Sequence, residues 1–177
     1  MSVAYQGVPG AFAHEACLTF LASHQPVGKP SFAAVLEAVE GGETDLGVLP
    51  IENNCAGPVE EAQALIAASP LSVIAEHELP VRMHLLALPD ASFEDIRTVT
   101  SHPIALRQCA LTLAALGLKT ETAANTALAA QSLSELSRAV LASEAAAKAY
   151  GLSILRRDMH DRSDNATRFA VLARESQ

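Results

Sequence analysis

Short apolar stretches with strand character alternate with segments of helical periodicity along almost the whole chain, and this alternation constrains the fold more than any other feature. Such an order is typical of an α/β protein, in which helices cover the faces of a sheet. We expect strands over residues 3–6, 46–51, 71–75, 81–88, 98–100, 118–122, 138–141 and 152–155. We expect helices over residues 11–23, 32–40, 58–68, 103–116 and 126–136, and a short helix after Ser143.

The length and composition agree with a folded α/β protein. The chain has 177 residues, of which 50% are hydrophobic, enough for the core of one compact domain or of two small lobes. The net charge of -8 and the pI near 5.2 disfavour binding to nucleic acid or to an anionic membrane, because both partners require a positive field. A small anionic ligand would therefore have to be held by local hydrogen-bond donors.

The sequence lacks the features of an exported, membrane-spanning or zinc-dependent protein. No apolar stretch approaches the ~20 residues needed to cross a bilayer, and the start MSVAYQG does not resemble a signal peptide, so we expect a cytoplasmic protein. Cys17, Cys55 and Cys109 are odd in number and form no C-x-x-C pair, which favours reduced thiols. His14 and Glu15 are not followed by a second histidine at metalloprotease spacing, and we expect no metal site.

Polar or glycine-rich turns follow several of the expected strands. In an open α/β sheet, such turns bring backbone N–H groups and helix N-termini to the edge of the sheet where anionic ligands bind. Three of these turns cover residues 7–10, 52–57 and 101–103. A fourth polar run, residues 165–168, precedes an apolar strand instead of following one. A segment that crosses back between two lobes would have this placement.

Each of these turns also has an ordinary structural interpretation. Gly7-Val8-Pro9-Gly10 can be a plain tight turn or a turn that donates amides to a carboxylate, and it lacks the full motif of a nucleotide site. Residues 52–57 can be a polar loop before a helix, in which Cys55 is a small buried residue rather than a nucleophile. His102 can cap a helix or act as a general base.

Taken together, the motifs resemble the catalytic domain of prephenate dehydratases, from the first residues to about Arg174. Each motif alone is a weak signal, whereas the ordered set over nearly the whole chain is strong. The motifs are Gly7-x-x-Gly10-Ala11-Phe12, the run GETDLGVLPIEN from Gly42 to Asn53 with Gly57 beyond it, Ser101-His102-Pro103 followed by Gln108-Cys109, Thr126-Ala127, Ala142-Ser143 through Tyr150-Gly151-Leu152, and Asn165-x-Thr167-Arg168-Phe169.

The resemblance implies a two-lobed α/β fold, similar to type II periplasmic binding proteins, with the active site in the interlobe cleft. Lobe 1 would comprise residues of about 1–78 and 165–177, and lobe 2 residues of about 79–164, within a single catalytic domain. The implied reaction is a step of phenylalanine biosynthesis, in which prephenate loses its ring carboxylate as carbon dioxide and its ring hydroxyl as water to give phenylpyruvate. The resemblance implies no cofactor and suggests a homodimer.

Many relatives of this kind continue into an ACT domain that binds phenylalanine. The sequence contains no such domain, so we expect either a standalone catalytic domain or a truncated piece, without feedback inhibition by phenylalanine.

The resemblance also assigns the site residues. Thr167 of the T-R-F motif and Glu52 of the E-N pair would be catalytic. The remaining matched positions would bind the substrate, and they are Asn53, Ser101, His102, Gln108, Asn165, Arg168, Gly10 and Ala11. No metal ligand is implied.

These residue types suit the implied chemistry. Because the ring becomes aromatic when the hydroxyl leaves, hydrogen-bond donors matter more than nucleophiles. The Thr167 hydroxyl can hydrogen-bond the departing oxygen, a contribution of about 10²- to 10⁴-fold for a well-placed acid. Since prephenate is a dianion, we expect Glu52 to be protonated, paired, or directed away so that it orients Asn53.

Three residues depart from the pattern of the family. Asn54 and Ala13 stand where serine or threonine is common, and Ile104 stands where glutamine is common, which could shift substrate preference or weaken activity.

The sequence leaves three alternatives to a prephenate dehydratase open. They are an arogenate dehydratase, a prephenate decarboxylase that leaves the ring non-aromatic, and a non-catalytic module that binds a small acid.

Overall fold

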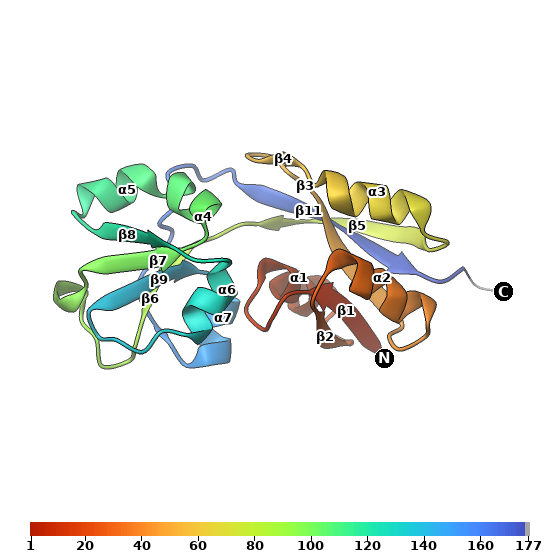
Figure 1. Cartoon of the computed structure of the whole chain (residues 1–177), viewed down its shortest axis with the longest axis horizontal. Helices are drawn as coiled ribbons and strands as arrows, with labels where there is room; N and C mark the ends of the chain where they lie inside the picture. Colours follow the sequence, from red (N-terminus) through yellow and green to blue (C-terminus); the bar gives the residue numbers. More distant parts are fainter. Residues whose placement is uncertain (176–177) are drawn as a thin grey trace. The chain divides into compact units, whose positions relative to one another are not determined.

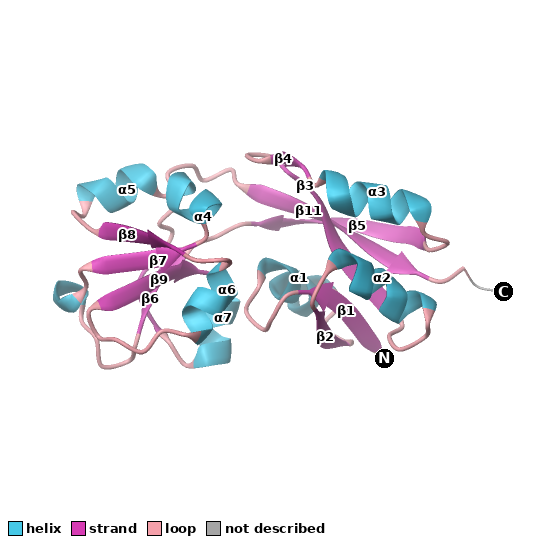
Figure 2. Cartoon of the chain, viewed as in Figure 1, coloured by secondary structure: helices cyan, strands magenta, loops and turns pink. Residues whose placement is uncertain are grey.

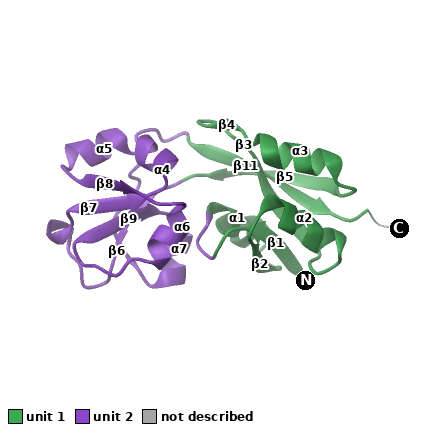
Figure 3. Ribbon diagram, viewed as in Figure 1, with its two compact units in different colours: residues 1–8, 12–81, 165–177 green, residues 9–11, 82–164 purple. Residues whose placement is uncertain are grey.

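The computed structural model describes residues 1–175 and shows helices and strands along the whole of that range (Figures 1 and 2). The predicted α/β class is confirmed. The chain divides into two compact units (Figure 3). The first comprises Met1–Val8, Phe12–Val81 and the chain from Asn165 onward, and the second comprises Pro9–Ala11 and Arg82–Asp164.

The first unit is built on one mixed sheet, in the strand order β2-β1-β3-β11-β5, with β4 paired to β3. β1 is parallel to β2 and to β3, whereas β11 is antiparallel to both β3 and β5. The strands are β1 (Ser2–Gln6), β2 (Gln25–Lys29), β3 (Leu46–Asn53), β4 (Gly57–Pro58), β5 (Ser72–Pro80) and β11 (Ala166–Ala173).

Helices cover both faces of this sheet. Residues that alternate along a strand point to opposite faces, and the two faces carry separate apolar clusters. Helix α1 (Phe12–Phe20) packs on the face that presents Tyr5, Val48 and Phe169. Helices α2 (Phe32–Glu40) and α3 (Glu60–Ala68) pack on the opposite face, which presents Ala4, Leu49 and Leu172.

The second unit has a five-stranded sheet in the order β10-β6-β9-β7-β8. β7 is parallel to β8 and β9, and β6 is antiparallel to β9 and β10. The strands are β6 (His84–Ala87), β7 (Thr98–Ser101), β8 (Lys119–Thr122), β9 (Arg138–Ala142) and β10 (Ser153–Arg156), and the helices are η1 (Phe93–Asp95), α4 (Pro103–Gln108), α5 (Ala110–Ala115), α6 (Thr126–Gln131) and α7 (Glu144–Tyr150).

The two units repeat one arrangement of parallel strands. In the first unit β1 lies between β2 and β3, and in the second β7 lies between β8 and β9. Each central strand therefore has a neighbour on either side that is reached by a helical connection. Ligands of open α/β sheets bind at the carboxyl ends of strands around such a switch point. We therefore expect ligand-binding residues at the carboxyl ends of β1, β3, β7 and β9.

Several elements differ from the sequence-based expectations. Strand β2 was not expected, because its sequence QPVGK contains proline and glycine; it lies at the edge of its sheet, where proline is tolerated. Strand β5 runs on to Pro80 because it pairs with β11 over its whole length. The helix expected over 103–116 is divided at Cys109, and the helix expected over 126–136 ends at Gln131.

Candidate active site

Three predicted site residues of the first unit meet where β3 ends and β11 begins. The register of these antiparallel strands places Asn53 directly opposite Thr167. The Nδ2 atom of Asn53 donates hydrogen bonds to Oγ1 of Thr167 at 2.9 Å and to Oδ1 of Asn165 at 2.9 Å. Asn165 is 4% exposed and Thr167 is half-buried. The polar run before β11 therefore faces the E-N pair, although more than one hundred residues separate them.

The orientation of the Asn53 amide is fixed by its own turn. Its Oδ1 accepts hydrogen bonds from the backbone N–H groups of Cys55, at 2.9 Å, and Ala56, at 2.8 Å. An asparagine amide has two donor hydrogens and two acceptor lone pairs, and these four contacts use all of them. Asn53 is thus left without a free donor for a substrate, and Nδ2 has to point at Thr167.

This arrangement sets the direction of the Thr167 hydroxyl proton. Because Oγ1 accepts from the amide of Asn53, the proton of the hydroxyl points away from that amide and is available to another group. Within the first unit, the described hydrogen bonds join Oγ1 to no histidine and no carboxylate. Thr167 is therefore arranged as a hydrogen-bond donor rather than as a nucleophile with an adjacent base.

Glu52 and Arg168 lie on the opposite face of the same two strands. They are also cross-strand partners, and alternation along the strands directs them away from the side that carries Asn53 and Thr167. The guanidinium of Arg168 pairs with Glu52 and lies 3.6 Å from the carboxylate of Glu76. Of the three alternatives expected for Glu52, the structure shows the paired one. The structure does not bring Glu52 or Arg168 to the Thr167 hydroxyl.

The predicted residues of the second unit begin at the carboxyl end of β7. Ser101 is 0% exposed, and its hydroxyl donates to the carbonyl oxygen of Leu141 at 2.8 Å, so this side chain ties β7 to β9. His102 is the N-cap of α4, and its Nδ1 accepts from the N–H of Ile104 at 3.2 Å. Of the two roles open to His102, the structure shows the cap.

Gln108 ends α4, and a neighbouring segment holds its main chain. The carbonyl oxygen of Gln108 accepts from the N–H of Asp161 at 2.8 Å. The carboxylate of Asp161 accepts from the N–H groups of Leu111 and Thr112, each at 3.0 Å. Burial opposes ionisation of Asp161, but these hydrogen bonds prevail and hold its pKa below the ordinary value. Asp161 thus fixes the turn that carries Gln108.

Gly10 and Ala11 belong to the second unit, although they lie between two segments of the first. The carbonyl oxygen of Gly10 accepts from the Ser143 hydroxyl at 2.7 Å, and that of Pro9 accepts from the Tyr150 hydroxyl at 2.6 Å. Gly10 has φ +88, and a Cβ there would lie 2.6 Å from the Cα of Ala146. The position therefore requires glycine for both conformation and space.

Ser143 and Tyr150 hold this segment; sequence reasoning expected Ser143 only as the cap of a short helix, which is confirmed, and gave Tyr150 no role. Ser143 follows β9 directly and also caps α7 by accepting from the N–H of Ala146 at 3.0 Å. Its place after β9 corresponds to that of Asn53 at the end of β3 in the other unit. The available signal was its position after an apolar strand, combined with the A-S and Y-G-L motifs.

The cysteines differ in exposure, and all three are free. Cys17 and Cys109 are buried, and burial raises the pKa of each thiol to about 12, so both stay protonated near neutral pH. Cys55 is exposed, and the expectation that it is buried was wrong. It lies in the exposed turn whose N–H groups donate to Oδ1 of Asn53.

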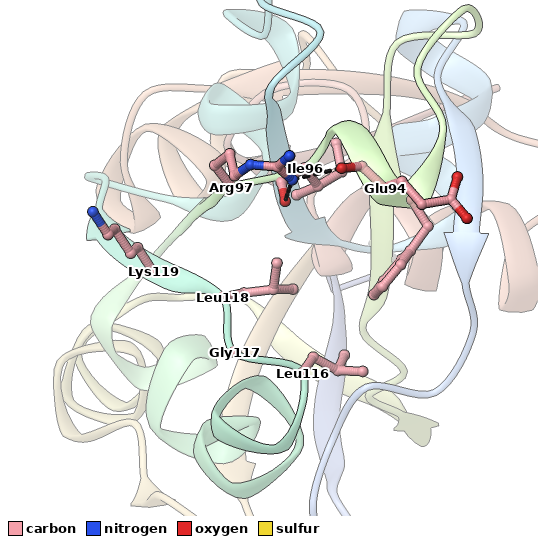
Figure 4. A pocket seen from close by; sticks show the side chains of 8 residues that line it. Glu94, Ile96, Arg97, Leu116, Gly117, Leu118 and Lys119 are labelled. Carbon is pink, nitrogen blue, oxygen red and sulfur yellow. Dashed lines mark hydrogen bonds between the residues drawn. The ribbon is translucent and has the colours of Figure 1, made fainter.

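A separate pocket of about 490 Å³ lies in the second unit, beside the amino ends of β7 and β8 (Figure 4). None of the predicted site residues lines it. Its walls are apolar apart from Glu94, Arg97 and Lys119. The Arg97 guanidinium donates to the main-chain oxygens of Glu94 and Ile96, and Lys119 extends away from the leucine side chains (Figure 4). These contacts close a turn and leave the pocket without a converging set of polar groups.

Two general features of the described residues bear on the class of protein. No helix among residues 1–175 is both long and apolar enough to cross a membrane. Across the same residues, no three His, Cys, Asp or Glu side chains are grouped so that they could hold a metal ion.

Comparison with known proteins decides the family. The family model described as prephenate dehydratase matches residues 3–177. The chain belongs to the prephenate dehydratase family. It is 43% identical over 176 residues to arogenate dehydratase/prephenate dehydratase 2 of Arabidopsis thaliana, covering 98% of this chain and 46% of the relative. It is 34% identical over 175 residues to a bifunctional N-acyl-homoserine lactone acylase/prephenate dehydratase of Komagataeibacter europaeus, covering 97% of this chain and 62% of the relative.

Solved structures of similar proteins have the same fold. A prephenate dehydratase of Arthrobacter aurescens in complex with L-Phe superimposes with a TM-score of 0.91 at 27% identity, covering 100% of this chain and 61% of that one. A structure described as a quorum quenching acylase gives a TM-score of 0.93 at 32% identity, covering 100% of this chain and 65% of that one.

More distant structures extend the likeness of fold. A periplasmic substrate-binding protein of Coxiella burnetii gives a TM-score of 0.50 at 15% identity, covering 99% of this chain and 85% of that one. The predicted likeness of fold to periplasmic binding proteins is confirmed.

The chain spans just under half the length of its Arabidopsis relative.

Proposed function

We propose that this chain carries out the decarboxylative dehydration of prephenate to phenylpyruvate. One observation carries the proposal: Oγ1 of Thr167 accepts a hydrogen bond from a fixed amide, which leaves its own proton available to another group. Membership of the prephenate dehydratase family supports the choice of substrate. In this proposal Thr167 donates to the ring hydroxyl as it leaves.

The reaction balances with one proton supplied by the enzyme and returned from solvent. The bond between the ring and its carboxylate breaks, carbon dioxide leaves, and the electron pair of that bond stays with the ring. The bond between the ring and the hydroxyl oxygen breaks at the opposite end, and the ring becomes aromatic. The departing oxygen takes a proton and leaves as water. A well-placed proton donor contributes about 10²- to 10⁴-fold to such a step.

Asn53 makes this donation easier without touching the substrate. As the Thr167 proton moves toward the leaving oxygen, negative charge grows on Oγ1. The Nδ2–H of Asn53 already points at Oγ1 from 2.9 Å, so it can stabilise that charge without reorganisation. We therefore assign Asn53 a positioning role, in place of the substrate-binding role expected from the resemblance.

Arogenate is the alternative substrate, because the Arabidopsis relative is named for both activities. Arogenate has an amino acid in place of the pyruvyl group, and the same leaving hydroxyl. The test is to incubate the purified chain separately with prephenate and arogenate, and to identify the products by chromatography and mass spectrometry. Phenylpyruvate from prephenate supports the proposal, whereas phenylalanine from arogenate alone would reassign the substrate. A non-aromatic dihydro product would replace dehydration by decarboxylation, and recovery of both substrates unchanged would reject the proposal.

Amide hydrolysis of N-acyl-homoserine lactones is a second candidate, favoured by the likeness to the bifunctional Komagataeibacter protein and to the quorum quenching acylase. An acylase of this kind needs an activated nucleophile or water. In the described first unit, Thr167 accepts from an amide instead of donating to a base, which favours dehydration. Incubation with an N-acyl-homoserine lactone decides this candidate, since hydrolysis of its amide releases free homoserine lactone.

A further inference from the structure

Both main-chain polar groups of Ala166, the residue directly before Thr167, bond to Asn54. Ala166 is buried, and its carbonyl oxygen accepts from the backbone N–H of Asn54 at 3.1 Å. Its own N–H donates to Oδ1 of Asn54 at 2.9 Å. On the side of β11 that faces β3, Asn54 thus supplies the donor for the Ala166 carbonyl oxygen and the acceptor for the Ala166 N–H.

These contacts extend the β3–β11 pairing beyond the last residue of β3. Strand β3 ends at Asn53, and in a regular ladder the main chain of the next residue would supply both the donor and the acceptor. Here the main chain of Asn54 supplies the donor and its side chain supplies the acceptor. The carboxamide of Asn54 therefore takes the place of a main-chain carbonyl.

The other neighbour of β11 holds the adjacent peptide groups. The carbonyl oxygen of Asn165 accepts from the N–H of Val81 at 2.8 Å. Because successive residues of a strand point their peptide groups to opposite sides, those of Ala166 point toward β3. The residue opposite Ala166 on β5 is Pro80, and the peptide groups of Ala166 point away from it. The hold on Ala166 thus depends on Asn54.

We infer that Asn54 is a positioning residue for Thr167, and this inference rests on the function proposed above. Asn53 fixes the side chain of Thr167 from the β3 side, and Asn54 fixes the main chain one residue earlier. Together they set the place and direction of the hydroxyl. Losing the Asn54 side chain leaves Thr167 bonded to Asn53 but removes the acceptor of the Ala166 N–H in the segment that leads into β11.

Asn54 is suited to a test that separates position from stability. It is exposed, so truncating it opens no cavity in the core. A side chain with no role beyond the surface would change neither turnover nor local protection. The variant Asn54→Ala removes the acceptor for the Ala166 N–H, and the matched variant Asn54→Asp keeps a carboxyl oxygen in that place.

The experiment measures amide hydrogen exchange and steady-state kinetics on the wild type and both variants. We expect the Ala166 amide to exchange at least about tenfold faster in Asn54→Ala, while amides of the central strands keep their protection. We expect kcat to fall about tenfold with KM within about twofold, because small displacements of a reacting group reduce the chemical step. Asn54→Asp should restore Ala166 protection and most of kcat, although its added charge can raise KM for a dianion.

Three outcomes would overturn the inference. They are unchanged Ala166 exchange in Asn54→Ala, a loss of kcat that Asn54→Asp does not restore, and a loss explained by a lower melting temperature of the whole protein. Failure of the proposed function is recognised separately, because the wild type would then convert neither substrate. The exchange measurement would still show whether Asn54 holds the segment before Thr167.

Discussion

Nδ2 of Asn53 lies 2.9 Å from Oγ1 of Thr167, and both lone pairs of the Asn53 side-chain oxygen accept backbone N–H groups of the following turn. The turn thereby decides which atom of the amide faces the threonine. A hydroxyl that accepts from such a fixed donor has one proton left to give. This relationship makes Thr167 a directed donor and underlies the first two predictions.

Replacing Thr167 with valine should reduce kcat by about 10²- to 10⁴-fold, because valine has nearly the same shape but no proton to donate. KM should stay within about threefold, since the side chain acts on the leaving oxygen rather than on the carboxylates. Thr167→Ser keeps the hydroxyl and should retain most of the activity. Steady-state kinetics on prephenate measure all three proteins, and a valine variant as active as the wild type would remove Thr167 from the mechanism.

Replacing Asn53 with aspartate should reduce kcat by about 10²-fold, because a carboxylate has no N–H to donate to Oγ1 of Thr167. The aspartate would instead accept the hydroxyl proton and turn it away from the substrate. Its oxygens can still accept from the N–H groups of Cys55 and Ala56, so the turn is kept. Kinetics with a melting curve on the same sample check this, and wild-type turnover in Asn53→Asp would contradict the assigned role.

The sequence predicted the polar residues at the strand ends but could not predict how their hydrogen bonds are used. Asn53 and Thr167 stand beside apolar strands, and the resemblance to the family assigned both to the site. Their pairing depends on the register between two strands that are 114 residues apart, and no local pattern contains that register. Alternation along β11 does predict that Thr167 and Arg168 face opposite ways, so the Arg168 side chain lies away from the Thr167 hydroxyl.

Ser101 illustrates the same limit in the second unit. A serine at the carboxyl end of β7 suggests a ligand contact, yet its hydroxyl donates to Leu141 on β9. That use follows from the order of strands in the sheet, which sequence periodicity does not contain. Strand β2 was missed for a local reason, because its proline and glycine disguise an edge strand.

Gly10 and Gly117 give a matched pair for measuring close packing in the second unit. Both have positive φ, but a Cβ at Gly117 meets nothing within 4 Å, whereas one at Gly10 lies 2.6 Å from the backbone of Ala146. Gly117→Ala should cost about 1 kcal/mol of unfolding free energy, for the left-handed conformation alone. Gly10→Ala should cost clearly more, because the backbone of α7 must also move. Urea denaturation measures both, and equal costs would show that the contact at Gly10 relaxes freely.

His84 should make the stability of the second unit depend on pH. Its side chain is 3% exposed, and its Nδ1 accepts from the N–H of Asp158 at 3.0 Å, which requires a neutral ring. Burial lowers the pKa of His84 below its ordinary value of 6.5, against the opposing attraction of the Asp158 carboxylate. The unfolded chain therefore binds a proton first as the pH falls, so this stabilisation is complete above pH 6.5 and is lost as the pH falls toward the folded pKa.

The variant His84→Asn isolates this contribution, because asparagine offers Oδ1 in the place of Nδ1 and does not titrate. Wild-type unfolding free energy should fall from pH 7 to pH 5 more steeply than that of His84→Asn, as measured by urea denaturation at each pH. The other groups around the ring, Arg157, Glu144 and His160, are unchanged in the variant, so their titration cancels in the comparison. If unfolding free energy changed with pH equally in the wild type and in His84→Asn, His84 would titrate alike in the folded and unfolded chain. That result would contradict the prediction.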